Sequence, residues 1–525
     1  MKILNTIEDF VIAIRECIEE KGCILYGAGQ AGKTIYRFLK ANHIIVSAFA
    51  VTDPEIHGEI EGVPVCGIDY FLERNPFSKR NIVIAVTEMK QPAIEEELEK
   101  RGIFSYIKLS DLLLYKLAKE NQKMAAKADG QSQAKEQAEQ TGGTIGYLTS
   151  GYFDSDYAEK RLIIDKIEGV SYVTIPKETA DITWNDIWYE GRSETYRQLM
   201  EACYCPNTYS PAVSLIHTFN TVCKTDRPWC ASFETTIPRI WPETPEEKEY
   251  YLQLVEYIKQ PNCKALYALC KNAYDLQRVS LMQHVSSKDT ELVMKKTKVL
   301  HPPQKILITE EEFWKKHDTQ KIHFLFIGRD FFIKGGREVL EVLTEFEGKY
   351  CFDLTLISSL QYGDYFTKTS YEEMCRCKSI IQEKSWIHYY ESLPNEKVLE
   401  KCKEAAVGLL PSFADTYGYA VLEMQAAGCP VITTNVRAFP ETNNEECGWV
   451  CRLPVDELGF CMERDTASWS EILRKELRRC FQEIFDAPEK VCEKGLKALE
   501  RIRRMHDPYK YQMELRKNLE MDKNI

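Results

Sequence analysis

Four charged side chains in the second half of the sequence could bind a diphosphate and act on the group attached to it. Arg329 follows the apolar run HFLFIG, and Lys334 stands just before a Gly-Gly pair that begins a helical pattern. Two cations five residues apart can hold one diphosphate and stabilise the charge on a departing group. Asp415 and Glu423, eight residues apart, supply carboxylates that can accept hydrogen bonds from ligand hydroxyls. These residues favour transfer of a group away from a diphosphate.

The same side chains fall where predicted strands give way to predicted helices. Apolar runs at 321–329 and 406–412 predict buried strands, and a helical pattern follows each of them. In an open α/β sheet, ligands bind at the carboxyl ends of the strands. The helix predicted to start near Gly418 is apolar nearly all round, so Glu423 inside it needs a partner, and a ligand hydroxyl could be that partner. The free N–H groups at the start of this helix suit a diphosphate.

Two motifs in this region carry a family resemblance. They are Gly328-Arg329…Lys334-Gly335 and Asp415-x7-Glu423, followed by Pro440-Glu441 in a later loop. Together they resemble the retaining GT-B glycosyltransferases of family 4, strongly over 321–450 and moderately over 145–320. The first acid of the family's motif is a glutamate, so Asp415 is one methylene shorter, which changes its reach.

The resemblance implies an enzyme, a glycosyltransferase, that takes a sugar from a nucleotide-sugar donor, a UDP- or GDP-sugar, and retains the anomeric configuration. It implies no metal and no further cofactor for transfer. The leaving diphosphate would take the proton of the acceptor hydroxyl on the same face of the sugar. The acceptor would be a glycan, a lipid-linked or a protein acceptor. The combination of domains in one chain suggests a role in bacterial surface glycan assembly.

The family's residue roles can be carried onto matching positions. Catalytic roles are implied for Arg329, Lys334 and Asp415, and Asp415 would touch hydroxyls of the donor sugar. Glu423 would bind the ribose. The implied donor-binding set is Gly328, Gly418, Tyr419, Glu423 and Glu441.

Two residues of the preceding block are candidates for the acceptor side. His217 and Glu234 each stand near the end of an apolar strand candidate, and Arg239 follows Glu234 closely. A histidine at the end of a strand is more often structural than ligand-binding. For Glu234 the two interpretations are evenly balanced.

Asp154 and Asp156 form the Asp-x-Asp pattern that binds a divalent metal in the other large glycosyltransferase fold, GT-A. Here the pattern precedes a helical stretch, and an N-cap at Asp156 explains it more simply. The sequence therefore predicts no metal site.

A glycine-rich turn near the N-terminus predicts a second nucleotide site. Gly27, Gly29 and Gly32 form a GxGxxG motif between a strand and a helix, and Asp53 ends the next strand, where it could contact a ribose. The first 117 residues resemble the small Rossmann-like domain of PglD-type sugar O-acyltransferases. The resemblance implies a module that binds a nucleotide or nucleotide sugar, or that is purely structural.

Alternating apolar runs and helical patterns predict an α/β protein, with an N-terminal Rossmann-like domain joined to a GT-B double Rossmann-like glycosyltransferase. The predicted parts are 1–117 (Rossmann-like), 118–144 (polar linker), 145–315 (acceptor side), 316–490 (donor side) and 491–525 (helical tail). Further strand candidates lie at 23–26, 44–51, 81–86, 105–109, 171–175, 211–216, 229–233, 264–269, 352–358 and 429–434.

Composition limits the partners. The 525 residues carry a net charge of −12, which argues against nucleic acid as the main partner. Since no run of 18 apolar residues occurs, no transmembrane helix is expected, and the first residues have the pattern of an amphipathic helix rather than a signal peptide. The 19 cysteines lack zinc or disulfide spacing, so we expect a cytoplasmic protein, with peripheral contact at the inner face of a membrane left open.

The sequence is also compatible with two other functions. The N-terminal domain could modify a nucleotide sugar with NAD, although its one Tyr-x-x-x-Lys, from Tyr36 to Lys40, lies inside a predicted helix. Alternatively, the chain could be a non-catalytic GT-B scaffold that binds a glycan, for which the shorter Asp415 gives slight support.

Overall fold

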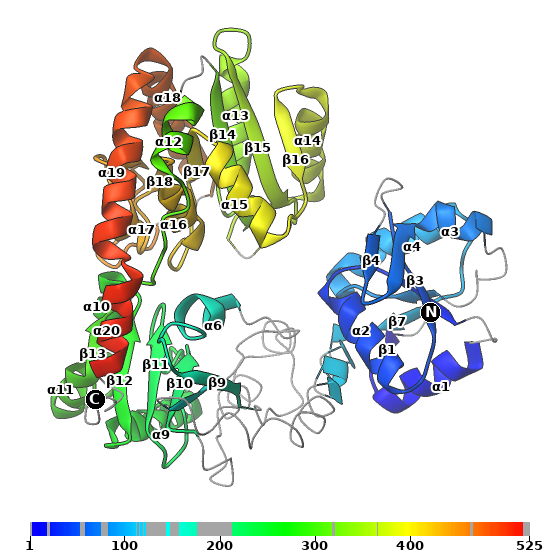
Figure 1. The fold of residues 1–525 in the computed structure, drawn as a ribbon, viewed down its shortest axis with the longest axis horizontal. Coiled ribbons are helices and arrows are strands. Elements are labelled where there is room, and N and C mark those ends of the chain that lie inside the picture. The colour runs from blue at the N-terminus through cyan, green and yellow to red at the C-terminus, as the bar shows by residue number, and fades with distance from the viewer. Residues whose placement is uncertain are drawn as a thin grey trace.

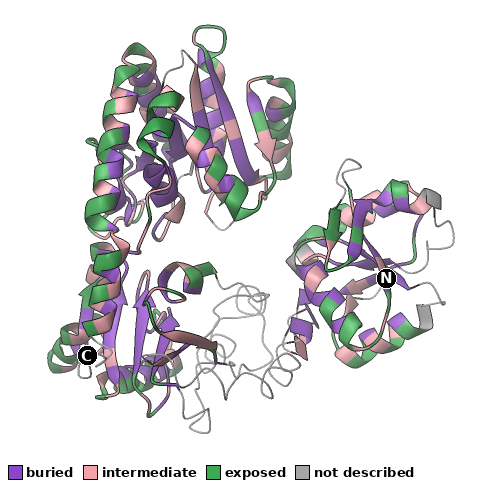
Figure 2. Cartoon of the chain, viewed as in Figure 1, coloured by how far each residue is buried: buried purple, intermediate pink, exposed green. Residues whose placement is uncertain are grey.

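The structure is a computed structural model, and it contains three β-sheets (Figure 1). It describes residues 3–17, 22–52, 58–74, 82–111, 113–114, 116–118, 120–121, 143–147, 157–175, 213–317, 321–364, 366–462 and 466–517. Asp53, Asp154, Asp156 and most of the predicted linker lie outside these residues. In each sheet the strands are mainly buried, while most of the covering helices expose one side (Figure 2).

The first sheet has seven strands in the order β1-β7-β6-β2-β3-β5-β4, and only the β4–β5 pair is antiparallel. Its strands are β1 (Ile3–Leu4), β2 (Cys23–Tyr26), β3 (Val46–Val51), β4 (Gly58–Ile60), β5 (Val63–Gly67), β6 (Ile82–Ile84) and β7 (Ile107–Leu109), and its helices are α1 (Ile7–Cys17), α2 (Gln30–Ala41), α3 (Ile68–Arg74), η2 (Glu88–Lys90) and α4 (Gln91–Lys100). Alternate residues of β2 enter different cores: Leu25 packs into one cluster, Ile24 and Tyr26 into the other. Both faces of this sheet are therefore covered.

The second sheet is six-stranded and fully parallel, in the order β13-β12-β11-β10-β8-β9. Its elements are β8 (Thr144–Tyr147), α6 (Tyr157–Leu162), β9 (Ser171–Thr174), β10 (Leu215–Phe219), β11 (Trp229–Phe233), α9 (Pro245–Lys259), β12 (Cys263–Ala268), α10 (Lys271–His284), α11 (Ser287–Lys296) and β13 (Thr297–Val299).

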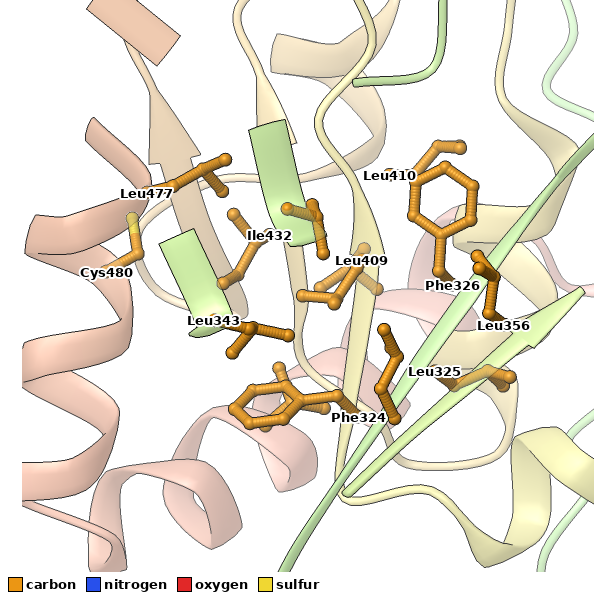
Figure 3. Close-up of a cluster of buried hydrophobic side chains, with 14 of the residues drawn as sticks. Phe324, Leu325, Phe326, Leu343, Leu356, Leu409, Leu410, Ile432, Leu477 and Cys480 are labelled. Carbon is orange, nitrogen blue, oxygen red and sulfur yellow. The ribbon is translucent and has the colours of Figure 1, made fainter. Parts of the chain in front are cut away.

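The third sheet is also six-stranded and parallel, in the order β16-β15-β14-β17-β18-β19. Its elements are α12 (Glu310–His317), β14 (Ile322–Asp330), α13 (Gly336–Phe346), β15 (Phe352–Ser359), α14 (Tyr371–Glu383), β16 (Ile387–Tyr390), α15 (Asn395–Glu404), β17 (Val407–Leu410), α16 (Tyr419–Ala426), β18 (Val431–Thr434), α17 (Phe439–Thr442), β19 (Gly448–Cys451) and α18 (Thr466–Asp486). Phe324, Leu409 and Ile432 from three neighbouring strands pack against Leu343 of α13 and Leu477 of α18 (Figure 3).

These observations confirm the predicted α/β class. The second and third sheets, each parallel and covered by helices, have the predicted double Rossmann-like arrangement, and we call them the second and third units. No helix in the described parts of the chain is long and apolar enough to cross a lipid bilayer.

The predicted helical tail joins these two units. Helix α19 (Glu489–Met505) packs against α16 of the third unit, and α20 (Pro508–Lys517) packs into the core of the second (Figure 1). Tyr511 of α20 is buried there, and its hydroxyl donates a hydrogen bond to the Leu162 carbonyl at 2.8 Å. Helices α19 and α20 therefore lead the chain back from the third unit to the second.

One predicted strand is displaced. The sequence predicts a strand at 211–216, but β10 occupies Leu215–Phe219. His217 and Thr218 are polar and were expected to end the strand, yet both are buried within it. In a parallel sheet covered on both faces, polar side chains can stay inside when they find hydrogen-bond partners.

The first sheet should fold without the rest of the chain. Both of its hydrophobic clusters draw only on residues between 4 and 117. We expect a 1–117 fragment and a chain beginning near Gln140 each to unfold cooperatively on heating, as followed by circular dichroism. A 1–117 fragment without a cooperative transition would contradict the proposed boundary.

Candidate functional site

Lys334 and Asp415 meet directly. Lys334 follows β14 and Asp415 follows the neighbouring strand β17, and Lys334 Nζ lies 2.7 Å from Asp415 Oδ2. The chain leaves β14 toward β15 and β16 on one side and continues from β17 toward β18 and β19 on the other. The pair therefore stands at the point where the strand order reverses, which is where ligands bind in open α/β sheets.

Two glycines allow this approach. A Cβ on Gly328 would lie 2.9 Å from Lys334 Cγ, so a larger residue would push the lysine side chain away. Gly335, which caps α13, has φ of +76°, and a Cβ there would lie 2.4 Å from the Pro411 carbonyl oxygen. Glycine at both positions lets the lysine and the loop after β17 come together.

Arg329 is placed differently. It lies in β14, next to the strand's last residue, as predicted, but its side chain is 83% exposed and its Nε is 3.5 Å from Asp330 Oδ1. An exposed pair at this distance contributes little to stability. The guanidinium is therefore accessible to an anionic ligand.

Glu423 is buried and paired across the two units. Its Oε1 lies 2.5 Å from Nη1 of Arg161 on α6, and the two side chains are 6% and 13% exposed. Arg161 Nη2 also donates to Gln304 Oε1 at 2.9 Å, and its guanidinium lies 4.8 Å from the Tyr419 ring centroid. Burial raises the pKa of Glu423, and the charge and hydrogen bond of Arg161 oppose that rise.

Glu234 also makes a contact across the units. It follows β11, and its Oε2 accepts a hydrogen bond from Thr416 Oγ1 at 3.0 Å, while Oε1 lies 3.0 Å from Arg239 Nη1. Since Thr416 adjoins Asp415, this acceptor-side candidate lies beside the Lys334–Asp415 pair.

Glu441 has an unexpected partner. Its two carboxylate oxygens accept hydrogen bonds from the backbone N–H groups of Lys271 and Asn272, at 2.6 and 2.7 Å. These residues begin α10 of the second unit, where free N–H groups and the helix dipole favour an anion. Burial raises the pKa of Glu441, and the two backbone hydrogen bonds oppose that rise. The carboxylate predicted to bind the donor is thus engaged by a helix N-terminus.

His217 lies inside the second sheet. The residue is 2% exposed, its Nε2 shares a hydrogen bond with Ser232 Oγ at 2.9 Å, and burial lowers its pKa to about 3. This environment agrees with the structural interpretation, and the acceptor-side role has no geometric support.

The remaining donor-site positions surround α16. Gly418 caps the helix with φ of +79°, and a Cβ there would meet the Phe439 ring at 2.4 Å. Tyr419 begins the helix and packs edge-on against Tyr157 of α6, with ring centroids 6.0 Å apart.

The N-terminal glycine turn lies apart from these residues, in the first sheet. Gly29 caps α2, and a Cβ there would meet nothing within 4 Å, whereas a Cβ on Gly32 would lie 2.0 Å from the Gly27 carbonyl oxygen. The turn follows β2, where the order of this sheet also reverses. Its predicted partner Asp53 lies outside the described residues.

The structure adds three residues that the sequence analysis did not single out. Arg161, Arg437 and Asn272 belong to no motif, yet each bonds across the two units; Arg437 Nε donates to Asn272 Oδ1 at 3.0 Å. Tyr157 and Arg161 are four residues apart on α6, a spacing that places both side chains on one face of the helix. This spacing is the signal in the sequence that points to Arg161.

Comparison with known proteins identifies the third unit. Residues 321–462 match the family described as glycosyl transferases group 1. An uncharacterised glycosyltransferase of Methanocaldococcus jannaschii is 25% identical over 155 residues, which cover 29% of this chain and 37% of the relative. The match thus spans little more than a third of that relative. The prediction of a glycosyltransferase is confirmed at the level of this domain.

Two solved structures illustrate the similarity in fold. Sucrose-phosphate synthase of Thermosynechococcus elongatus covers 71% of this chain and 98% of its own, with 14% identity and a TM-score of 0.47. The HepE protein of Anabaena, in complex with UDP and glucose, covers 72% of this chain and 99% of its own, with 11% identity and a TM-score of 0.44.

Replacing Glu441 should destabilise the protein. The change Glu441→Ala removes two charge-assisted hydrogen bonds from the start of α10 and should lower the free energy of unfolding by about 1–3 kcal/mol. Urea unfolding would measure the loss. Glu446→Ala, at an exposed glutamate of the same region, should change it by less than about 0.5 kcal/mol. Equal effects of the two variants would contradict the capping role.

Proposed function

We propose that this chain is a retaining glycosyltransferase. It moves a sugar from a nucleoside diphosphate donor, a UDP- or GDP-sugar, to a hydroxyl of a glycan, lipid-linked or protein acceptor. The observation that carries the proposal is the Lys334–Asp415 pair at the point where the third sheet reverses its strand order. The family match over the same unit supports the reaction class.

Lys334 has a donor left for a ligand after its two bonds to the protein. An ammonium has three donors, and Asp415 Oδ2 and the Ala414 carbonyl oxygen, at 3.3 Å, occupy two of them. The third can reach a phosphate oxygen of the donor, where exposed Arg329 adds a second positive charge. As the bond between the sugar C1 and the diphosphate oxygen breaks, both cations stabilise the developing negative charge.

The acceptor hydroxyl forms the new bond to C1 on the face that the diphosphate leaves. Its proton passes to the departing phosphate oxygen, so the reaction needs no protein nucleophile. Asp415 orients hydroxyls of the transferred sugar, and Glu423 accepts hydrogen bonds from the ribose. Glu234, one hydrogen bond from the loop that carries Asp415, lies on the acceptor side.

The N-terminal turn supports a second, separate proposal. Gly29 leaves open space at the start of the 12-residue helix α2, and the turn lies at the switch point of its own sheet. This favours a module that binds a nucleotide or nucleotide sugar. Gly29→Val should then abolish nucleotide binding by the 1–117 fragment and leave transfer to soluble acceptors unchanged.

We place the enzyme in bacterial surface glycan assembly in the cytoplasm because the N-terminal module and the glycosyltransferase occur in one chain.

A donor panel tests the main proposal. With UDP-, GDP-, ADP- and dTDP-sugars, the wild-type chain should release free nucleoside diphosphate, and EDTA should not stop it, because side-chain cations take the place of a metal. Lys334→Ala and Arg329→Ala should each lower kcat by about 10²-fold or more, while Lys349→Ala, at an exposed lysine of the same unit, should not.

Replacing Asp415 and replacing Glu423 should change different kinetic parameters. Asp415→Ala should mainly lower kcat, whereas Glu423→Ala should mainly weaken nucleotide binding. If both variants keep wild-type activity, the donor site is elsewhere. Turnover of no donor in the panel would favour the glycan-binding scaffold, and consumption of NAD would favour a bifunctional protein.

A further inference from the structure

Glu423 has one oxygen occupied and one available. Oε1 accepts from Arg161, whereas Oε2 accepts no hydrogen bond from the residues that the structure describes. A half-satisfied carboxylate in an almost fully buried side chain is costly unless a ligand completes it. One oxygen of the carboxylate therefore binds a protein cation, and the other is left for a ligand.

Arg161 is itself held in one orientation. Gln304 accepts from its second terminal nitrogen, and its guanidinium lies over Tyr419 and, at 5.9 Å, near the Tyr157 ring. A planar guanidinium fixed on several sides presents its Nη1 in a defined direction. Because Arg161 belongs to the second unit and Glu423 to the third, this orientation depends on the two units being in contact.

The surroundings leave Arg161 as the cation that contacts Glu423. Other charged or titratable groups near α16, among the described residues, include Tyr157 on α6, Tyr419 on α16, Cys402 on α15, Lys316 on α12, Arg501 on α19 and His506 just after α19. Strands β17 and β18, which also pack against α16, carry no titratable side chain.

Each of these other groups is neutral or engaged elsewhere. Burial raises the pKa of Tyr157 to about 12 and raises those of Tyr419 and Cys402 well above their ordinary values. Burial lowers the pKa of His506, whose Nδ1 hydrogen-bonds to the Pro302 carbonyl, to about 3. Lys316 donates to the Ala427 carbonyl and Arg501 to the Thr442 carbonyl.

We propose that Arg161 is a positioning residue of the donor site, contributed by the second unit. It holds Glu423 as an oriented carboxylate through Oε1 and leaves Oε2 for a ribose hydroxyl. This inference rests on the proposed function and adds to it that donor binding depends on contact between the two units.

A pH series on Arg161→Met tests the proposal. Without the guanidinium, burial raises the pKa of Glu423 unopposed, so its carboxyl group becomes protonated at a higher pH than in the wild type. The probes are UDP, GDP, ADP and dTDP, with dissociation constants measured by isothermal titration calorimetry. The ratio of variant to wild-type Kd should be about 10 or more near pH 6 and should fall as the pH rises toward about 8.5. Taking the ratio cancels the titration of the phosphate itself.

Two further variants separate positioning from packing. Arg161→Lys keeps a positive charge, so its Kd ratio should stay nearly constant with pH. Lys298→Met removes a different ion pair, one within the second unit, from Lys298 of β13 to Glu514 of α20 at 2.9 Å, and should leave the Kd unchanged. A loss in Arg161→Met that is equal at both pH values, or no loss at all, would overturn the proposal.

Glu423→Gln distinguishes failure of this inference from failure of the proposed function. If Glu423→Gln weakens binding and Arg161→Met does not, the donor site stands and the role of Arg161 is wrong. If Glu423→Gln binds like the wild type, or the wild type binds none of the four probes, the donor site itself is misplaced and the inference fails with it.

Discussion

Helix α16 belongs to two hydrophobic cores at once, and the arrangement of the second and third units depends on this. Val421 and Met424 pack into the cluster around the third sheet, whereas Leu422 and Ala426 pack into the cluster around the second. A helix that is apolar all round must be covered on every side, since exposing either face would return apolar surface to water. The second unit therefore has to lie against the third, and the residues at the start of α16 lie at their junction.

A helix buried on all sides also needs partners for its polar groups, and three such partners come from three different elements. Arg161 of α6 pairs with Glu423, and Gln425 donates to the Thr442 carbonyl at 3.0 Å. Lys316 of α12 donates to the Ala427 carbonyl at 2.6 Å, just after the helix. Unpaired, each group would carry the full penalty of desolvation. Together these bonds fix the helix along its axis as well as across it.

The sequence was sufficient for several buried strands and for the junctions between strand and helix at the candidate site, because both depend on local patterns. The sequence misplaced β10 and did not predict β13, β16 or β19. Apolar runs predicted β2, β11 and β14 nearly to the residue, and the glycines at 335 and 418 marked where α13 and α16 begin. The sequence was insufficient to predict which distant residues form hydrogen bonds and ion pairs with one another. The Arg161–Glu423 pair spans 262 residues and the bonds of Glu441 to α10 about 170, and no periodicity encodes such separations. Glu441 lies in a predicted donor loop, yet the N-terminus of α10 is a strong anion site in its own right.

Consecutive residues Asp415 and Thr416 connect the two halves of the proposed reaction. Asp415 turns toward Lys334 within the third unit, and Thr416 donates to Glu234 of the second. Transfer with retention requires the acceptor hydroxyl to approach C1 beside the departing diphosphate, so the groups that bind donor and acceptor must be adjacent. A single loop after β17 that contacts both sides meets this requirement through its covalent geometry, because neighbouring Cα atoms are about 3.8 Å apart. Any movement that separates the units would break the Thr416–Glu234 bond and the Arg161–Glu423 pair together, so both substrates would lose their alignment in the same step.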